Sequence, residues 1–468
     1  MLRLHDTATG QVAPLRLRTD GRVSMYVCGP TVYDSPHLGH GRFSLVFDVL
    51  RRYLLFTGLD VTYVSNITDI EDKIIERAAE RGIEPAELTT TYEAVWWEAM
   101  DALGVLRPDE TPHATAYVSR MVDLVEDLVS REVAYETATG VYLSVLDVPG
   151  YGLLAHQPLE SLRSGARVEA DEEKRSPLDF VLWKKAKPGE PTWDSPWGPG
   201  RPGWHTECVV MSLDLLGDGF DLHGGAIDLI FPHHENERAQ AVAAGREFAR
   251  HWVHNGWVTV SGEKMSKSLG NFTSLDDLLA RSDARAYRLL VLRSHYRSPI
   301  EVTPDTISDA ESGLARLDEL ARRFSLPDLL ATGPIVDAGS GGTDGADDLD
   351  TGAVTRFRHS MDDDLDTPGA LAAVFDLVRQ ANAAADAGDR TGARRSANTA
   401  AFLCAVLGLP VRAGSEAPID PPTAELVRRR DEARTELDWD RADALRDELE
   451  GMGWLVEDGP DGTRIRRR

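Results

Sequence analysis

The feature that most constrains the fold of this chain is a strand-like run, an amphipathic run and a second strand-like run close together near the N-terminus. Residues 23–28 favour a strand that ends at a Gly-Pro turn, and residues 61–64 favour another. After Gly39, apolar residues recur at helical spacing: Phe43, Val46, Phe47, Leu50 and Leu54. This order predicts a βαβ unit and therefore a parallel sheet. Ligands bind such sheets at the carboxyl ends of the strands, where Cys28 and Thr68 are expected to lie.

The remainder of the chain predicts an interrupted nucleotide-binding fold followed by helices. Residues 119–200 combine an amphipathic helix, a hairpin-like run and a stretch rich in Lys, Trp, Pro and Gly, which indicates an inserted connective domain. The α/β pattern then resumes, so residues 1–118 and 201–305 are expected to form the two halves of one Rossmann-type domain. Residues 306–416 are expected to form a helical bundle domain. A disordered loop is expected within it at 333–350, where apolar residues are few.

A Pro-rich linker separates the final segment, residues 420–468, from the helical domain. Its pattern predicts one helix over residues 426–449, and the Gly-Pro-Asp-Gly sequence at 459–462 predicts the turn of a hairpin. The segment ends in Arg-Ile-Arg-Arg-Arg. We therefore expect an α/β protein that consists of a Rossmann-type parallel sheet with an inserted domain, an α-helical domain and a small C-terminal unit.

Composition narrows the classes of function. Three cysteines in 468 residues exclude a disulfide framework and are typical of the reducing cytoplasm, which is the expected location. No run approaches the roughly 18 apolar residues that span a membrane, so no membrane association is expected. A net charge of −26 argues against non-specific nucleic-acid binding, but it permits a nucleic-acid partner on a local basic surface.

Two motifs far apart in the sequence have the chemistry of phosphate handling. In residues 36–40, Pro-His-Leu-Gly-His, the two histidines can donate hydrogen bonds, and Gly39 lets a phosphate approach the start of the following helix. In residues 263–271, two lysines stand among small hydroxyl residues before a glycine, which suits a loop that closes over a triphosphate. Each motif alone is weak, since histidines near a turn are commonly incidental and a basic run is commonly a solvated turn.

A second group of residues has the chemistry of a metal site. His233 and Glu237 are spaced i, i+4, which places both side chains on one helix face, and both are good zinc ligands. A polar helix surface explains this window equally well. Cys28 and Cys208 both fall in motif-rich regions at expected strand or helix ends, whereas Cys404 lies in an apolar helix where packing accounts for it. Spacing leaves open whether the two pairs meet.

Taken together and in this order, the His-Leu-Gly-His and Lys-Met-Ser-Lys-Ser motifs resemble the two signatures of class I aminoacyl-tRNA synthetases. Four further stretches narrow the resemblance. Residues 28–34, 66–73, 203–208 and 231–237 are similar to the cysteinyl-tRNA synthetase family.

The resemblance implies ATP-dependent activation of L-cysteine, with Mg²⁺ expected beside the ATP, and transfer of the cysteine to tRNA(Cys) by a monomer. The catalytic residues that it implies are His37, His40, Lys264 and Lys267. For ATP binding it implies His37, Gly39, His40 and Lys267. It implies one zinc ion, held by Cys28, Cys208, His233 and Glu237, that separates a thiolate from a hydroxyl. The residues implied for the cysteine pocket are Gly29, Thr31, Thr68, Trp204 and Asp228.

A close alternative is the ligase that joins cysteine to an amino-sugar inositol in mycothiol biosynthesis, because it resembles the same catalytic core and zinc site. The C-terminal segment favours tRNA charging. Residues 434–449 are similar to the anticodon-binding end of cysteinyl-tRNA synthetases, and the terminal arginines could contact phosphates or bases. A catalytically silent nucleotide- or tRNA-binding paralogue is disfavoured, because the histidines, lysines and candidate ligands are all present.

Overall fold

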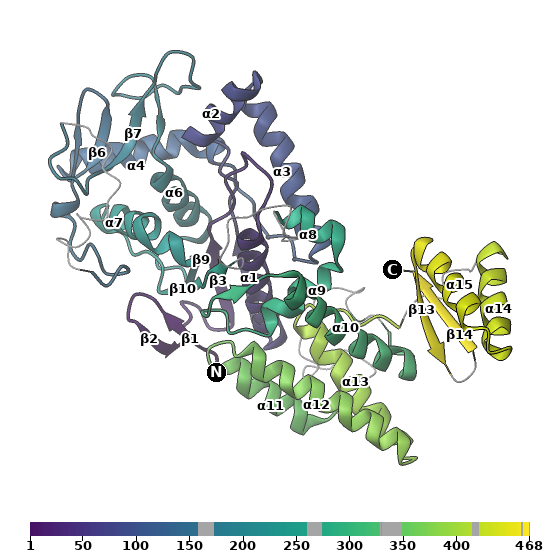
Figure 1. The fold of residues 1–468 in the computed structure, drawn as a ribbon. Helices are drawn as coiled ribbons and strands as arrows, with labels where there is room; N and C mark the ends of the chain where they lie inside the picture. Colours follow the sequence, from purple (N-terminus) through teal and green to yellow (C-terminus); the bar gives the residue numbers. More distant parts are fainter. Residues whose placement is uncertain are drawn as a thin grey trace. The chain divides into compact units, whose positions relative to one another are not determined.

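The structure is a computed structural model that describes residues 1–157, 173–259, 274–327, 329, 349–413, 421–459 and 462–467. The chain forms two compact units (Figure 1). The first comprises Met1–Ala315 and Leu329–Pro410, and the second comprises Arg316–Asp328 and Val411–Arg468. In the described ranges, no helix is long and apolar enough to cross a membrane.

A four-stranded parallel sheet with the order β10-β9-β3-β4 forms the centre of the first unit. Its strands are β3 (Arg22–Val27), β4 (Asp60–Val64), β9 (Leu222–Ala226) and β10 (His251–Asn255). β3 pairs with β4 from Arg22↔Asp60 to Tyr26↔Val64, and it pairs with β9 on its other side. The predicted βαβ unit, and with it the predicted α/β fold class, is confirmed.

The helix between β3 and β4 is α1 (Leu38–Phe56), and it is buried along most of its length. Phe47, Leu50 and Leu54 are 0% exposed, and Phe43 and Val46 are buried as well, which explains why the predicted periodicity extends along the helix. The other helices of this part are α2 (Asp72–Arg81), α3 (Pro85–Ala102), α6 (Trp204–Leu216), α7 (Glu235–Ala243), α8 (Leu275–Arg281) and α9 (Ala284–Leu292).

The segment predicted as an insertion contains a separate antiparallel sheet with the order β5-β6-β7-β8. After η1 (Ala114–Tyr117), which precedes the predicted segment, the elements are α4 (Val118–Ser130), β5 (Ala134–Glu136), β6 (Gly140–Leu143), η2 (Val145–Asp147), β7 (Phe180–Lys185) and β8 (Gly200–Pro202). Trp183 is fully buried in its hydrophobic core. The small hairpin of β1 (Arg3–Asp6) and β2 (Gln11–Pro14) at the N-terminus was not expected from the sequence.

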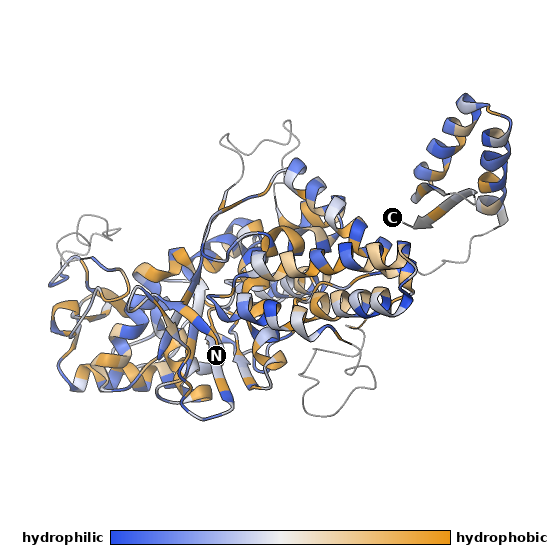
Figure 2. Cartoon of the chain, turned by 90° about the horizontal axis from the view of Figure 1, so that it is seen from below, coloured by the Kyte–Doolittle hydropathy of each residue, from blue (hydrophilic) through white to orange (hydrophobic). Residues whose placement is uncertain are grey.

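Between residues 304 and 406 the described part of the chain is mostly helical, as predicted from the sequence. Following β11 (Val258–Thr259) and β12 (Ile300–Glu301), the chain forms α10 (Pro304–Phe324), α11 (Thr351–Asp362), α12 (Thr367–Asp386) and α13 (Arg390–Val406). The last three begin at aspartate N-caps, each of which accepts a hydrogen bond from a backbone N–H in the first turn: Asp350, Asp366 and Asp389. Hydrophobic and hydrophilic residues are mixed along the helices of the chain (Figure 2), and in α12 the buried residues Leu371, Val374, Leu377 and Ala381 recur at intervals of three and four. Most of the predicted loop at 333–350 lies outside the described residues.

The C-terminal segment contains two helices, α14 (Pro421–Thr435) and α15 (Trp439–Gly451), so the predicted single helix is wrong. Leu437 adopts a left-handed backbone with φ of +61°, which ends the first helix. Asp438 then caps the second by accepting a hydrogen bond from the Arg441 N–H at 3.2 Å. The predicted hairpin is confirmed as β13 (Trp454–Gly459) and β14 (Gly462–Arg467).

Candidate active site and metal centre

The two histidines of the phosphate motif cap the start of α1. His37 is the N-cap residue and His40 is the third residue of the helix. Nδ1 of each ring accepts a hydrogen bond from the backbone N–H of the other residue, in both cases at 3.2 Å. The rings stack with their centroids 3.6 Å apart. Gly39 and both histidines therefore lie at the positive end of the α1 dipole, which attracts a phosphate.

Both imidazoles are neutral at pH 7. Although His37 is exposed at the surface, the surrounding protein partly desolvates its ring, which lowers the pKa of His37, and the carboxylate of Asp228 opposes this effect. Burial and the neighbouring His37 lower the pKa of His40 to about 3. Because Nδ1 is the acceptor in each ring, the one proton of the neutral form is on Nε2. Each ring therefore offers one N–H donor, as hydrogen bonding to a phosphate oxygen requires.

The predicted catalytic lysines, Lys264 and Lys267, lie outside the described residues. The chain on both sides of their segment is anchored near the start of α1. On one side, the guanidinium of Arg42 donates to the Trp257 carbonyl at 2.5 Å. On the other, the Leu275 N–H donates to the carbonyl of Pro36 at 3.2 Å. These contacts fix where the segment leaves and re-enters the fold.

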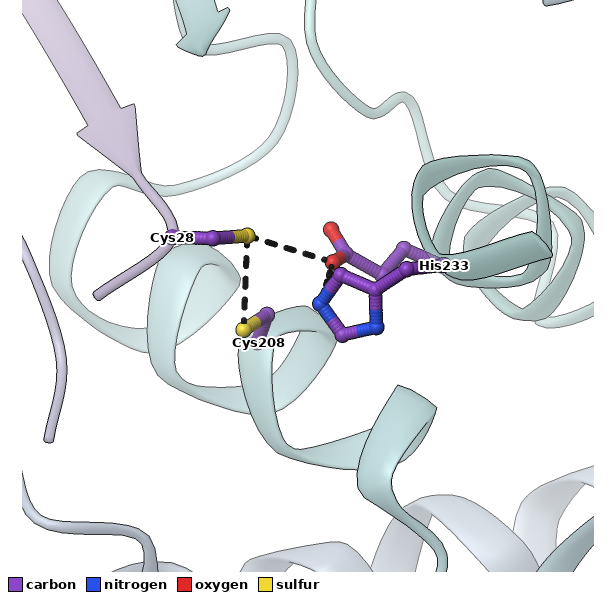
Figure 3. A group of neighbouring side chains, drawn as sticks. Cys28, Cys208 and His233 are labelled. Carbon is purple, nitrogen blue, oxygen red and sulfur yellow. Dashed lines mark hydrogen bonds and ion pairs between the residues drawn. The ribbon is translucent and has the colours of Figure 1, made fainter. Parts of the chain in front are cut away.

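The four predicted metal ligands come together at the carboxyl edge of the sheet. Cys28 directly follows β3, Cys208 lies in α6, and His233 and Glu237 lie in η4 (Ile230–His234) and α7 (Figure 3). The Sγ atoms of the two cysteines are 3.6 Å apart. Glu237 Oε1 lies 3.4 Å from Cys28 Sγ and 2.7 Å from His233 Nε2. One donor atom from each of the four buried residues lies within 4.8 Å of the others, so this group could hold a metal ion.

The protonation of this cluster is set by burial and by mutual contacts. Burial raises the pKa of Cys28, and its hydrogen bond to Cys208 adds to the effect. Burial also disfavours the Cys208 thiolate, but hydrogen bonds from Cys28 and His233 lower its pKa to about 6. At His233, burial is outweighed by the charge of Glu237, which raises the pKa to about 10. These contacts place the Glu237 carboxylate and the Cys208 thiol of lowered pKa beside a proton on His233, and a metal ion bound by this group would displace that proton.

Buried histidines surround this group, and the sequence reasoning missed them. His223 lies on β9, with Nε2 2.5 Å from Glu237 Oε2 and Nδ1 3.2 Å from the Tyr26 carbonyl oxygen. His234 Nε2 lies 3.3 Å from Cys28 Sγ, and its Nδ1 lies 2.8 Å from His254 Nε2. Cys28, His223, His234 and Glu237 form a second donor group that shares two members with the first. The sequence did indicate these residues in one way, because histidines occupy strand positions 223 and 254, where apolar residues are expected.

The residues predicted for the cysteine pocket lie around the same edge. Thr31 and Thr68 face each other in a parallel bridge, and a Cβ atom at Gly29 would lie 1.7 Å from the carbonyl oxygen of Asn66. Trp204 stacks on His233 with ring centroids 4.0 Å apart. Asp228 is exposed on η3 (Ile227–Leu229).

Two partners of these residues were missed from the sequence. The Asn66 Oδ1 atom accepts a hydrogen bond from the Gly29 N–H at 2.9 Å, and Asn66 Nδ2 donates to Thr68 Oγ1 at 3.1 Å. The Thr68 hydroxyl also lies 3.0 Å from Glu207 Oε2, and Glu207 is fully buried. In the sequence, only the polar side chains at positions 66 and 207, inside otherwise apolar segments, indicated a role for these residues. Their spacing does not show that both contact Thr68.

Protein-family models match most of the chain in order. The catalytic domain of class I (C) tRNA synthetases matches residues 15–312, the DALR domain matches 356–412, and the anticodon-binding domain of cysteinyl-tRNA ligase matches 418–466. The solved structure of methionyl-tRNA synthetase from Mycobacterium tuberculosis, in complex with methionyl-adenylate, has a similar fold. Its TM-score is 0.58 at 19% identity, over 82% of this chain and 89% of that one.

Relatives described as cysteine–tRNA ligase are similar over the full length. The protein of Halorhodospira halophila is 46% identical, and that of Thioalkalivibrio sulfidiphilus is 47% identical, with 100% of both chains covered in each case. These similarities agree with the motifs and with the geometry of the site. The chain belongs to the cysteine–tRNA ligase family of class I aminoacyl-tRNA synthetases.

Proposed function

We propose that this protein activates L-cysteine with ATP and transfers it to tRNA(Cys). The observation that carries the proposal is the meeting of Cys28 and Cys208 with the His233–Glu237 pair at the sheet edge that also carries the start of α1. A thiol-selective centre and a phosphate-binding helix start are the two parts that cysteine activation needs. The full-length similarity to cysteine–tRNA ligases supports the same activity.

The metal is proposed to be zinc, held by Cys28, Cys208, His233 and Glu237. Two thiols with an imidazole and a carboxylate form a donor set that zinc favours. This group is preferred over the second because it contains both thiols and because Trp204 stacks on its histidine. His223 instead packs among Tyr26, Phe248 and Trp252, which suits a supporting role. When bound, zinc would supply a Lewis acid that prefers the thiolate of cysteine to the hydroxyl of serine.

The chain's own residues would orient the substrate around that centre. His223 holds one oxygen of Glu237, which leaves Oε1 directed to the donor group. Gly29, Thr31 and Thr68 would shape the floor of the pocket, and Trp204 would cover one side. Asp228 is the exposed carboxylate among the residues proposed for the cysteine pocket, and its charge raises the pKa of His37. It would therefore bind the ammonium group of the substrate, between the amino-acid pocket and the phosphate-binding residues.

In the first step, a carboxylate oxygen of cysteine forms a bond to the α-phosphorus of ATP while the bond from this phosphorus to the bridging oxygen breaks, and pyrophosphate leaves. The carboxylate is already a nucleophile, so the protein needs no general base. The Nε2–H groups of His37 and His40 and the amines of Lys264 and Lys267 would stabilise negative charge on the phosphates. In the second step, a ribose hydroxyl of the tRNA end attacks the carbonyl carbon, AMP leaves and the hydroxyl proton is released.

The C-terminal unit is proposed to bind the anticodon region of tRNA(Cys), which the family match over residues 418–466 supports. A cytoplasmic monomer is proposed as well. The low cysteine content, three in 468 residues, suits a reducing compartment.

The deciding experiment measures transfer of labelled cysteine with ATP to a tRNA(Cys) transcript, beside a reaction with an amino-sugar inositol. Charging of the tRNA alone is expected. A variant truncated before residue 418 should retain cysteine-dependent pyrophosphate exchange but charge tRNA poorly. Transfer to the sugar alone would replace this function with the mycothiol-type ligase, and exchange that depends on another amino acid would contradict the cysteine assignment.

A further inference from the structure

The indole of Trp96 lies against the phosphate-handling histidines from a different helix. Trp96 belongs to α3, and only 6% of it is exposed. Its ring meets the His40 imidazole with centroids 5.6 Å apart and planes at 82°. His40 also stacks on His37 at 3.6 Å. The His40 ring is therefore held between an aromatic neighbour from its own helix and one from α3.

The hydrogen bonds that orient the two histidines are long. Each Nδ1 accepts from a backbone N–H at 3.2 Å, which is at the upper end of the range of about 2.7 to 3.2 Å that N–H···O bonds in proteins cover. His37 is exposed, so water competes for its part of the capping box. Rotation about χ2 of a histidine has broad minima, and a weak hydrogen bond restricts it little. Packing against a rigid ring is needed to restrict it further.

We propose that Trp96 is a positioning residue that holds the His40 imidazole in the orientation needed for adenylate formation. The inference rests on the proposed function, in which the Nε2–H of His40 donates to a phosphate oxygen of ATP. Trp96 acts through His40 and has no assigned contact with the substrate. The donor must meet charge that develops as the bond to the α-phosphorus forms, and displacements of about 1 Å suffice to weaken such stabilisation strongly.

The neighbouring Trp97 provides a matched control. It lies on the same helix but packs under the guanidinium of Arg107, 4.2 Å from the ring centroid, and its Nε1–H donates to Glu93 at 3.2 Å. Replacing Trp97 removes as many atoms as replacing Trp96 and leaves the His40 contact in place.

The test compares Trp96→Phe, Trp96→Met, Trp96→Ala and Trp97→Ala in the full-length protein by ATP–pyrophosphate exchange. We expect Trp96→Ala to lower kcat by about 10-fold or more with a smaller change in the KM for ATP, because the hydrogen bond of a misoriented His40 loses most where charge develops in the transition state. Trp96→Phe should restore most of the rate, since it restores a ring beside His40. Trp96→Met, which fills space without a ring, should fall between them, and Trp97→Ala should exchange like the unmodified protein.

Zinc content, cysteine affinity and thermal midpoint are measured for each variant. Wild-type kcat in Trp96→Ala, or equal losses in Trp96→Ala and Trp97→Ala, would overturn the role of Trp96. If Trp96→Ala does not fold, the role of Trp96 is decided by comparing kcat of Trp96→Phe with kcat of Trp96→Met. Equal kcat values in these two variants would count against the proposal. Absence of cysteine-dependent exchange in the unmodified protein would instead refute the proposed function, so the two failures are distinguishable.

Discussion

The thiols of Cys28 and Cys208 meet at an Sγ–Sγ distance of 3.6 Å although 180 positions separate them in the sequence. One follows the central strand of the sheet and the other lies on the helix that begins after the insertion. The distance is too long for a disulfide bond, which requires about 2.05 Å. An Sγ–Sγ distance of this size suits two ligands of one metal ion. The first prediction therefore concerns the loss of one of these two thiols.

Replacing Cys208 with serine should remove most of the bound zinc and weaken cysteine binding strongly. A hydroxyl is a poor zinc ligand, and the remaining three donors include only one thiolate. Metal analysis and the affinity for cysteine measure the two effects. Cys404→Ala serves as the control, because Cys404 is a buried thiol in α13 and should leave zinc unchanged. Full zinc with unchanged cysteine affinity in Cys208→Ser would contradict the ligand set.

Removal of the metal with a chelator should separate cysteine binding from ATP binding. Cysteine affinity should fall, and added Zn²⁺ should restore it, whereas Mg²⁺ should not, because Mg²⁺ binds thiolates poorly. Nucleotide affinity should change little, since His37 and His40 belong to a capping box that does not involve the four ligands. Calorimetric titration of the stripped and reloaded protein gives both affinities. Equal cysteine affinity before and after stripping would refute the metal's role in selection.

Replacing Lys267 with alanine should lower adenylate formation by orders of magnitude while zinc content stays the same. The amine is proposed to stabilise charge on the phosphates, and loss of one such preorganised group costs about 100-fold or more. Pyrophosphate exchange reports the rate and metal analysis provides the control. Near-normal exchange in this variant would rule out the assignment of the lysine-rich motif.

Contacts between site residues that are close in the sequence were predicted better than contacts between residues that are far apart in the sequence. The i, i+4 spacing of His233 and Glu237 has a direct geometric meaning, and the structure brings their side chains within 2.7 Å. The strand order decides which distant segments meet, and spacing carries no information about it. For this reason the meeting of the cysteines was inferred only through family resemblance, and the contact of His223 with Glu237 was missed. The break at Leu437 was missed because leucine rarely adopts a positive φ.

The depressed pKa of His40 should make stability depend on pH between about 3 and the ordinary value of 6.5. In that window the unfolded chain binds a proton at this position and the folded chain does not. The free energy of unfolding therefore rises with pH, and the protein loses stability as pH falls below 6.5. Urea unfolding at pH 7.5, 6.5 and 5.5 should show a smaller decline for His40→Asn than for the unmodified protein. An identical decline would mean that the pKa of His40 is the same in the folded and unfolded chains.

Substituting alanine for Gly29 should disrupt the cysteine pocket through a main-chain clash. The new Cβ would lie 1.7 Å from the Asn66 carbonyl oxygen, so the strand end that carries Cys28 must move away from the segment that carries Thr68. Overpacking of this kind costs about 1 to 3 kcal/mol of stability. Cysteine affinity should fall more than ATP affinity, because the displaced segments line the pocket while Gly39 and His40 lie on α1. Gly451→Ala is the control, since a Cβ there meets no atom within 4 Å. Because Asn66 also holds the Gly29 N–H at 2.9 Å, a variant with normal cysteine affinity would show that this bridge does not shape the pocket.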